Sequence, residues 1–519
     1  MLHRSARPAA VFAALFLGHA AAVLAAQDCS ALLKLVIPGG SIQKAVQVPA
    51  GPAPTPPGAP PVAAMIPAHC RVDGVIGAHT GRDGKAYGIR FAVAMPAQWN
   101  GRLVYQGGGG LNGSVQPPLG AVAAGDKPAL ARGFAVVNSD SGHEGAVFDG
   151  SFMADQQAGL DFLYQSIGKV MAAARPIIAA HYGTGAAHTY FVGCSTGGRE
   201  AMISAQRYPA EFDGIVAGAP AMRTSYSNLA LRWITASLNA AAPTDPQGHS
   251  LTAQALSATD RKLVVDGLLK SCDALDGVRD GMIFNTTGCA FDPQVLQCPV
   301  EKTDSCLSPV QVNAIKRAFA GPKSASGRQV YPGFAYDTGI GAKGMGIPGL
   351  LSGGMAPEGG MPSGRDMDVD AEAAKAHDGR EMMGDTDAWT NLSSFTGHGG
   401  KLIFFHGLSD PWFSALETVR YYTSLSKDPS DGTGPVTDWS RLFLVPGMGH
   451  CGGGEATLDR FDMLSAIVAW VEQGQAPAQV IATGAAYPGR SRPLCPYPQH
   501  AQYSGRGDSE SAANFSCQE

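Results

Sequence analysis

Short runs of apolar residues recur along the chain, and each has the length of a buried β-strand. The runs in the first part of the chain cover residues 87–95, 102–105, 134–138, 189–192 and 214–217. Apolar residues at helical spacing predict helices at 161–182, 200–208 and 458–473. Strands that alternate with helices predict an α/β protein whose sheet is mostly parallel and is covered by helices on both faces.

The strand pattern is interrupted by one long segment. It fades after about residue 222 and returns in two apolar runs at 401–405 and 441–445. A chain of 519 residues is too long for a single ordinary core, so a large insertion or a second domain is expected. The predicted organisation is one sheet domain formed by residues 27–222 and 391–519, with an inserted domain at 223–390.

The first residues have the pattern of an export signal. Arg4 and Arg7 precede an apolar stretch at 9–24, and Leu24-Ala-Ala offers small residues for cleavage before Gln27. A membrane anchor is the alternative, but the apolar run is short for a membrane span. We therefore predict a signal peptide at 1–26, a secreted or periplasmic protein, and no membrane attachment after cleavage.

The ten cysteines indicate disulfides, and the net charge argues against a nucleic-acid-binding protein. An even number of cysteines in an exported chain predicts disulfides. Zinc is a weak alternative because the cysteines are scattered and no Cys-x2-Cys pair occurs. The net charge of −5 gives no sign of the basic surface that a nucleic-acid-binding protein needs.

The segment Gly193-Cys-Ser195-Thr-Gly197 carries the clearest chemical signal. It fits Gly-x-Ser-x-Gly and lies between a predicted strand and a predicted helix, which is the context of a nucleophile elbow. An ordinary glycine turn with an incidental serine is the alternative. The flanking elements favour Ser195 as the nucleophile of an α/β-hydrolase.

A serine nucleophile needs a base, and the base needs an acid to orient it. In α/β-hydrolases the chain order is serine, acid, histidine. His450 follows the predicted strand at 441–445, and Asp410 follows the strand at 401–405, so both lie in loops past strand ends. Asp387 and Asp462 are weaker candidates for the acid, because one precedes its strand and the other lies in a predicted helix. A structural histidine is the alternative for His450.

Two backbone N–H groups are needed to stabilise the oxyanion of the transition state. Thr196 supplies one, since it follows the nucleophile, and the glycine run at 107–110 is the candidate for the other. Cys194 and Cys451 flank the candidate nucleophile and base. If they pair, the bridge would hold the two catalytic loops together.

The segment 272–283 carries three aspartates around a glycine turn, a pattern that suits calcium. Its spacing is not that of an EF-hand, and a solvated acidic turn is the alternative. The candidate ligands are the carboxylates of Asp273, Asp276 and Asp280 and the backbone carbonyls of Val278 and Met282. Such an ion would be structural.

Four motifs together resemble the tannase and feruloyl esterase family over essentially the whole mature chain. They are Gly-Cys-Ser-Thr-Gly-Gly-Arg at 193–199, Cys-Asp-Ala-Leu-Asp-Gly at 272–277, His-Gly-Leu-Ser-Asp at 406–410 and Pro-Gly-Met-Gly-His-Cys at 446–451. The stretch 490–498 is similar to the MHETase-like branch of that family, which hydrolyses mono(2-hydroxyethyl) terephthalate.

This resemblance implies an α/β-hydrolase fold whose lid is inserted between nucleophile and acid. It implies the triad of Ser195, Asp410 and His450, with Gly110 and Thr196 as oxyanion donors, and a structural Ca²⁺ on the acidic turn without an organic cofactor. The implied disulfides are Cys29–Cys70, Cys194–Cys451, Cys272–Cys289, Cys298–Cys306 and Cys495–Cys517.

The implied activity is hydrolysis of small aromatic esters of feruloyl or galloyl type through an acyl-enzyme, by a monomer. A MHETase-like activity is the alternative within the same chemistry. Phe413 matches an aromatic position that lines the substrate pocket of that branch. Residues 337–388, however, contain no Phe, Trp or Tyr, whereas the lid of that branch contributes tryptophans. A secreted binding protein that kept the fold is the alternative of another class.

Overall fold

The computed structural model describes residues 28–54, 62–343, 347–353, 362–427 and 434–519. The predicted signal peptide at 1–26 lies outside these residues. Among the helices of the described segments, none combines the length and the apolar character that crossing a membrane would require.

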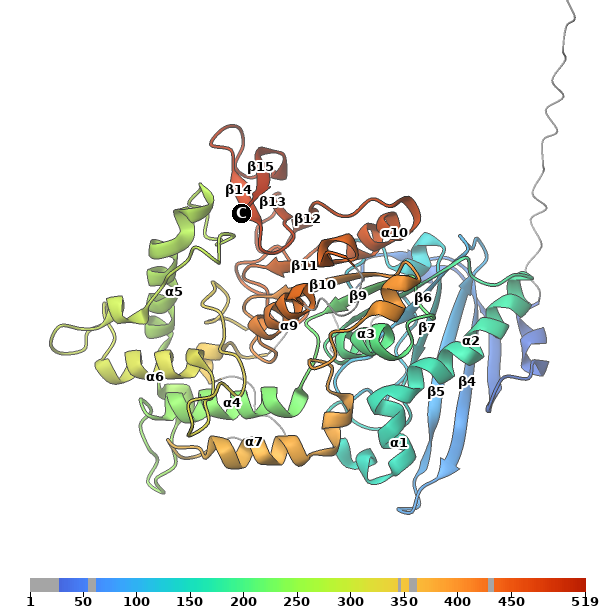
Figure 1. Ribbon diagram of the computed structural model, residues 1–519, viewed down its shortest axis with the longest axis horizontal. Helices are drawn as coiled ribbons and strands as arrows, with labels where there is room; N and C mark the ends of the chain where they lie inside the picture. The colour runs from blue at the N-terminus through green and yellow to red at the C-terminus, as the bar shows by residue number, and fades with distance from the viewer. Residues whose placement is uncertain (1–27, 55–61, 344–346, 354–361, 428–433) are drawn as a thin grey trace, which may run out of the picture.

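A nine-stranded mixed sheet forms the centre of the fold, in the order β1-β4-β5-β7-β6-β8-β9-β10-β11 (Figure 1). Six neighbouring strands run parallel, and they include six of the predicted apolar runs. They are β7 (Ala135–Ser139), β6 (Arg102–Gln106), β8 (His188–Cys194), β9 (Gly214–Gly218), β10 (Lys401–Gly407) and β11 (Ser440–Val445). Because they are parallel, the loops after β6, β8, β10 and β11 all leave the same edge of the sheet.

The other three strands of the sheet are antiparallel, and only one of them, β5, coincides with a predicted strand. β1 (Gly40–Val48), β4 (His69–Thr80) and β5 (Ala86–Pro96) pair in that order, and β5 joins the parallel part through β7. β4 alternates between buried and half-buried residues and contains Gly74 and Gly77, so it lacks a continuous apolar run. The sheet is therefore mixed, with its parallel part where the sequence predicted it.

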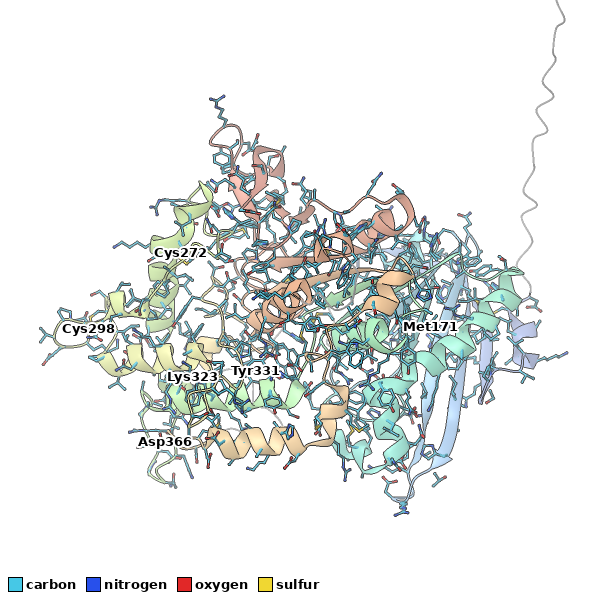
Figure 2. The ribbon with its side chains drawn as sticks, in the orientation of Figure 1. Met171, Cys272, Cys298, Lys323, Tyr331 and Asp366 are labelled. Atoms are coloured by element: carbon cyan, nitrogen blue, oxygen red, sulfur yellow. A yellow bond between two sulfur atoms is a disulfide. The ribbon has the colours of Figure 1, made fainter. Side chains whose placement is uncertain are left out.

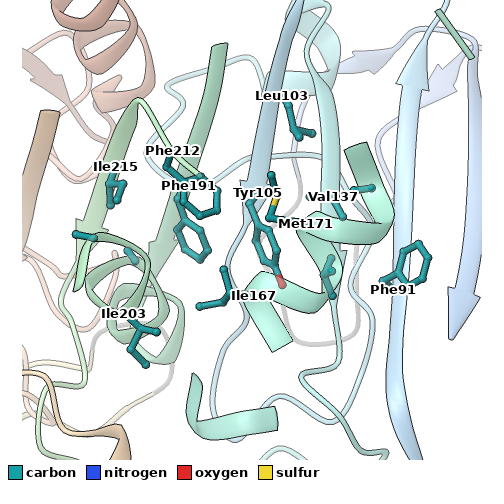
Figure 3. Close-up of a cluster of buried hydrophobic side chains, with 14 of the residues drawn as sticks. Phe91, Leu103, Tyr105, Val137, Ile167, Met171, Phe191, Ile203, Phe212 and Ile215 are labelled. Atoms are coloured by element: carbon teal, nitrogen blue, oxygen red, sulfur yellow. The ribbon is translucent and has the colours of Figure 1, made fainter. Parts of the chain in front are cut away.

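Helices cover both faces of the sheet. α2 (Ser166–Tyr182), α3 (Thr196–Arg207) and α9 (Ala415–Lys427) pack on one face, and α10 (Met463–Gln473) packs on the other. Successive strand residues serve opposite faces, so Tyr105 packs with α2 while Val104 packs with α10. Figure 3 shows the first of these cores, where the rings of Tyr105 and Phe191 stack with centroids 4.9 Å apart.

The regular elements described between β9 and β10 are all helices, and this region has its own core. Their main helices are α4 (Thr224–Asn239), α5 (Ala258–Cys272), α6 (Pro309–Ala320) and α7 (Val369–Asp378). Leu231, Leu268 and Ile315, from three of these helices, are buried in one cluster. Ser257 and Ser308 cap α5 and α6 through capping boxes. In Figures 1 and 2 this region lies to one side of the sheet, with Cys272 and Cys298 in its outer part.

The shorter elements complete the chain. They are α1 (Gln156–Leu160) and α8 (Ser393–Gly397), and the two-stranded ribbons β2 (Gly51–Pro52) with β3 (Met65–Ile66), β12 (Val480–Thr483) with β13 (Ser491–Leu494), and β14 (His500–Tyr503) with β15 (Phe515–Gln518).

All ten cysteines form disulfides. The pairs are Cys29–Cys70, Cys194–Cys451, Cys272–Cys289, Cys298–Cys306 and Cys495–Cys517. They are the same pairs that the family resemblance implies. Such a complete set is typical of proteins that fold outside the cytosol.

Candidate active site

Ser195 occupies a sharp turn between β8 and α3. Its φ of 66° and ψ of −123° lie in a region that residues with side chains rarely adopt. The turn is held from both sides, because the Ser195 N–H donates to the Gly218 carbonyl at 3.0 Å and the Ser195 carbonyl accepts from Arg199 at 3.0 Å. α3 begins at the next residue, so the positive end of its dipole faces the serine. This helix was predicted at 200–208, and it begins four residues earlier, at Thr196.

Asp410 and His450 meet across the loops that follow β10 and β11. The His450 Nδ1 lies 2.7 Å from the Asp410 Oδ2, and both side chains are buried. The other Asp410 oxygen accepts from the backbone N–H groups of Trp412 at 2.8 Å and Phe413 at 3.1 Å. The carboxylate is thus fixed by its own loop and is free to orient the imidazole.

A second histidine lies against the same carboxylate. The His406 Nε2 is 3.3 Å from the Asp410 Oδ2, and the His406 ring also contacts the Thr418 hydroxyl and the Phe413 carbonyl. Burial alone would raise the pKa of the Asp410 carboxyl, but His450 and His406 together hold that pKa well below its usual range. Asp410 therefore stays ionised at neutral pH.

The Cys194–Cys451 disulfide joins the loops that carry Ser195 and His450. Its two Cα atoms are 5.9 Å apart although 257 positions separate them in the chain. Each cysteine is the direct neighbour of a candidate catalytic residue, so the bridge brings the candidate nucleophile and the candidate base to the same side of the molecule.

The glycine loop after β6 lies beside the start of α3. The Thr196 hydroxyl donates a hydrogen bond to the Gly110 carbonyl, which links the two predicted oxyanion donors. Across the described part of the chain, the N–H groups of Gly110 and Thr196 have no protein acceptor. Both residues line the same cavity as Ser195. Two free N–H donors beside a serine are what an oxyanion hole requires.

A cavity of about 440 Å³ opens at Ser195. One part of its wall is apolar and aromatic, formed by Phe148, Met153, Phe162, Leu163, Trp412 and Phe413. The rings of Trp412 and Phe413 are parallel with centroids 5.4 Å apart, and the Phe413 centroid lies 5.2 Å from that of His450. The polar part of the wall is formed by Arg199, Thr224, Ser225, Asn228, Glu381 and Asp385. Its size and lining suit one small aromatic molecule.

The acidic turn of the predicted calcium site does not line this cavity. Burial raises the pKa of Asp276 to about 7, and repulsion from Asp280 and Asp273 adds to that rise. The turn thus gathers carboxylate oxygens, the donor type that a hard cation prefers. The Asp280 carboxylate is, however, bonded to Arg492 and lies 3.7 Å from Arg490. In the residues that the structure describes, no three acidic, imidazole or thiolate groups converge on a metal position. The calcium site stays a prediction.

Comparison with known proteins decides the family. The family model for tannase and feruloyl esterase matches residues 70–347 and 364–518. This chain belongs to the tannase and feruloyl esterase family. As a member, it is a carboxylic ester hydrolase.

Three relatives illustrate the range of this tannase and feruloyl esterase family. The chain is 40% identical to mono(2-hydroxyethyl) terephthalate hydrolase of Piscinibacter sakaiensis, over 88% of this chain and 85% of that protein. It is 30% identical to a probable feruloyl esterase B-2 of Aspergillus flavus, over 75% of this chain and 76% of that protein. Its fold matches the crystal structure of feruloyl esterase B from Aspergillus oryzae with a TM-score of 0.74 at 24% identity, covering 94% of this chain and 99% of that one. The mixed sheet is therefore that of an α/β-hydrolase.

The structure of this family member adds site residues that the sequence analysis did not identify. Glu200 is buried in α3, and its carboxylate accepts from the Gly108 N–H at 2.8 Å, the Asn112 amide at 2.8 Å and the Ser141 hydroxyl at 3.0 Å. It thereby holds the glycine loop against the nucleophile turn. Its place just after the Gly-x-Ser-x-Gly motif was a usable signal. Phe148 carried no signal, because it comes to the cavity from a long irregular loop.

Proposed function

We propose that this esterase hydrolyses small aromatic esters of feruloyl or galloyl type through an acyl-enzyme formed on Ser195. The observation that carries the proposal is the Asp410–His450 hydrogen bond of 2.7 Å beside a serine turn that opens into an aromatic cavity. An aromatic acyl group gains from the Trp412 and Phe413 faces both apolar burial and stacking. Phe413 thus keeps the substrate-lining role that the resemblance implied.

The proposed reaction has two halves. The Ser195 hydroxyl attacks the ester carbonyl while His450 takes its proton, and Asp410 stabilises the resulting imidazolium. The N–H groups of Gly110 and Thr196 bind the oxyanion. His450 then returns the proton to the departing alcohol. In the second half His450 takes a proton from water, which attacks the acyl-enzyme. His450 then returns the proton to Ser195 as the aromatic acid leaves.

The direct test is Ser195→Ala. Turnover of a p-nitrophenyl ester should fall by roughly 10⁴-fold or more, because the nucleophile is lost. A fluorophosphonate probe should label the wild-type protein and leave the variant unlabelled. Ser424→Ala, on the exposed side of α9, is the matched control and should retain both turnover and labelling. Wild-type turnover by Ser195→Ala would exclude this mechanism, and absent labelling of the wild type would favour a non-catalytic binding protein.

Hydrolysis of mono(2-hydroxyethyl) terephthalate is a second candidate activity. The 40% identical relative carries that name, and the cavity wall includes the buried guanidinium of Arg199. The Arg199 guanidinium donates to the Leu163 and Phe162 carbonyls at 3.2 Å each, and Glu200 and Asp385 act on it electrostatically. It still puts a positive charge in the cavity wall that could attract an anionic acyl group. Glu381 and Asp385 also line the polar wall, and ionised carboxylates there would disfavour the anionic terephthalate monoester. Comparing kcat/KM for methyl ferulate, methyl gallate and the terephthalate monoester would distinguish the two candidate activities.

The same proposal covers the organisation of the protein. The inserted region, residues 223–390, acts as a lid, since it supplies Asn228, Glu381 and Asp385 to the cavity wall. The protein works outside the cytosol, secreted or periplasmic, as its five disulfides favour, and as a monomer. A structural Ca²⁺ is proposed on the acidic turn at 273–282.

A further inference from the structure

Asp337 is a buried carboxylate for which the reaction described above has no use. It belongs to the inserted region, in the irregular stretch between α6 and the short turn at Leu350–Ser352. Its residue is only 1% exposed, and it does not line the cavity. Burying a carboxylate costs free energy unless hydrogen bonds offset the cost, so its contacts indicate its role.

Asp337 bonds to both of the loops that carry the acid and the base. Its Oδ2 accepts from the Ser409 hydroxyl at 2.5 Å and from the Gly447 N–H at 2.7 Å. Ser409 directly precedes Asp410, and Gly447 lies three residues before His450. One carboxylate oxygen thus joins the two loops whose relative position sets the Asp410–His450 hydrogen bond.

The backbone next to Asp337 strengthens this junction. The Gly339 N–H donates to the Ser409 hydroxyl at 2.9 Å, so that hydroxyl both donates to and accepts from the inserted region. A side chain at position 339 would come within 2.6 Å of the Gly447 carbonyl and 2.7 Å of the Ser409 Oγ. The segment 337–339 is therefore packed directly against both loops.

The carboxylate meets few compensating groups. Its second oxygen, Oδ1, has no hydrogen-bond partner among the described residues. Burial raises the pKa of the Asp337 carboxyl despite the bonds from Ser409 and Gly447. A buried carboxylate with so few partners is not expected to stabilise the fold. Its role is better explained by the placement of the two loops that it binds.

We propose that Asp337 is a positioning residue, which sets the distance and angle between Asp410 and His450 by holding the acid loop and the base loop to the inserted region. This inference rests on the proposed triad. It makes the inserted region part of the catalytic framework as well as a cover for the substrate. Asp337 acts through Ser409 and Gly447 and touches no reacting atom.

The test compares Asp337→Ala, Asp337→Asn and Ser409→Ala on a p-nitrophenyl ester. Asp337→Ala should lower kcat by roughly 10- to 100-fold, because a small displacement of catalytic groups greatly reduces the reaction rate. KM should stay within about twofold, since position 337 is outside the cavity wall. Asp337→Asn should recover most of the lost kcat, because its amide oxygen can accept both hydrogen bonds. The kcat of Ser409→Ala should lie between those of Asp337→Ala and Asp337→Asn.

Asp260→Asn is the matched control. Asp260 is another buried carboxylate of the inserted region. It accepts from Ser257 and Gln311 and pairs with Lys302 at 2.8 Å, and none of these residues belongs to a catalytic loop. This variant should lower Tm and leave kcat unchanged. All variants are assayed well below their Tm. A wild-type kcat in Asp337→Ala would overturn the proposal, as would an equal loss of kcat in Asp260→Asn. If Asp337→Ala does not fold, a wild-type kcat in Ser409→Ala decides against it.

The triad itself is tested separately by fluorophosphonate labelling. If the wild-type protein is labelled and the Asp337 variants show the wild-type kcat, only the positioning role is refuted. Unlabelled wild-type protein refutes the proposed function on which it rests.

Discussion

At the scale of single residues, Gly110 is one of the positions of this site that leave no room for a side chain. Its φ is +58°, and an added Cβ would lie 2.7 Å from the Val147 Cγ1 and 2.9 Å from the Val147 carbonyl. Gly110→Ala should therefore move the N–H that is proposed to bind the oxyanion and lower kcat by roughly 100-fold. Steady-state kinetics with a p-nitrophenyl ester measure this loss. Gly109→Ala is the control in the same loop, because a Cβ there meets open space. Equal losses in both variants would contradict the assignment of Gly110.

Asp385 can make substrate preference depend on pH. Burial raises its pKa to about 8, and repulsion from Asp387 adds to the rise. The charged groups that act on it are Asp387, Arg223, Glu417 and Arg199, and Glu381 shares its wall of the cavity. The carboxyl is neutral below about pH 8 and negative above it. It should then repel a terephthalate carboxylate only in the higher range.

The expected outcome is a ratio of kcat/KM values that falls as pH rises through about 8. The ratio compares the terephthalate monoester with methyl 3,4-dimethoxycinnamate, a neutral ester without an ionisable phenol, so that the titration of the triad cancels. A screened repulsion of about 1 kcal/mol corresponds to roughly a fivefold fall. Asp385→Asn should remove the pH dependence, and a ratio that falls equally in that variant would assign the effect to another group.

At the scale of elements, the sequence predicted best those strands that a local apolar pattern determines. The buried strands β6 to β11 are short apolar runs, and each catalytic candidate follows one of them, so chain order and strand ends were enough to select Ser195, Asp410 and His450. β1 and β4 were missed because their half-exposed residues and glycines break the apolar run. Asp337 was missed for another reason, because its role depends on two loops that only the folded chain brings together. Glu200 was missed although its place just after the Gly-x-Ser-x-Gly motif offered a signal.

The Cys194–Cys451 disulfide is the covalent link between two of those loops. Replacing both cysteines by alanine should reduce the free energy of unfolding by roughly 2–5 kcal/mol, because the bridge closes a very long loop. It should also lower kcat, since Ser195 and His450 each adjoin one of its ends. Chemical denaturation and ester kinetics would measure the two effects.

The Cys298–Cys306 disulfide provides the matched control. It spans only 8 positions and lies in the inserted region, away from the cavity wall. Its removal should cost less stability and leave kcat unchanged. An unaltered kcat in the Cys194/Cys451 double variant would show that packing alone aligns the two loops.

The whole molecule depends on how the inserted region is attached to the sheet domain, and the acidic turn is one point of attachment. The Cys272–Cys289 disulfide holds the turn to α5. On the other side, Asp280 bonds to Arg492 of β13, and its carbonyl accepts from Arg490 at 2.8 Å. An ion in this turn would stiffen the connection between the inserted region and the C-terminal strands.

If calcium binds this turn, removing it should lower Tm. A ligand that binds only the folded state at about 100 times its Kd stabilises that state by about 2.7 kcal/mol, so chelation should cost several degrees at most in a protein of this size. Added Ca²⁺ should restore Tm, and Asp276→Asn should abolish the response because the most buried of the candidate carboxylates loses its charge. Asp266→Asn, at an exposed position of α5 paired with Lys262, should respond like the wild type. An unchanged Tm after elemental analysis has verified metal loss would contradict the calcium site.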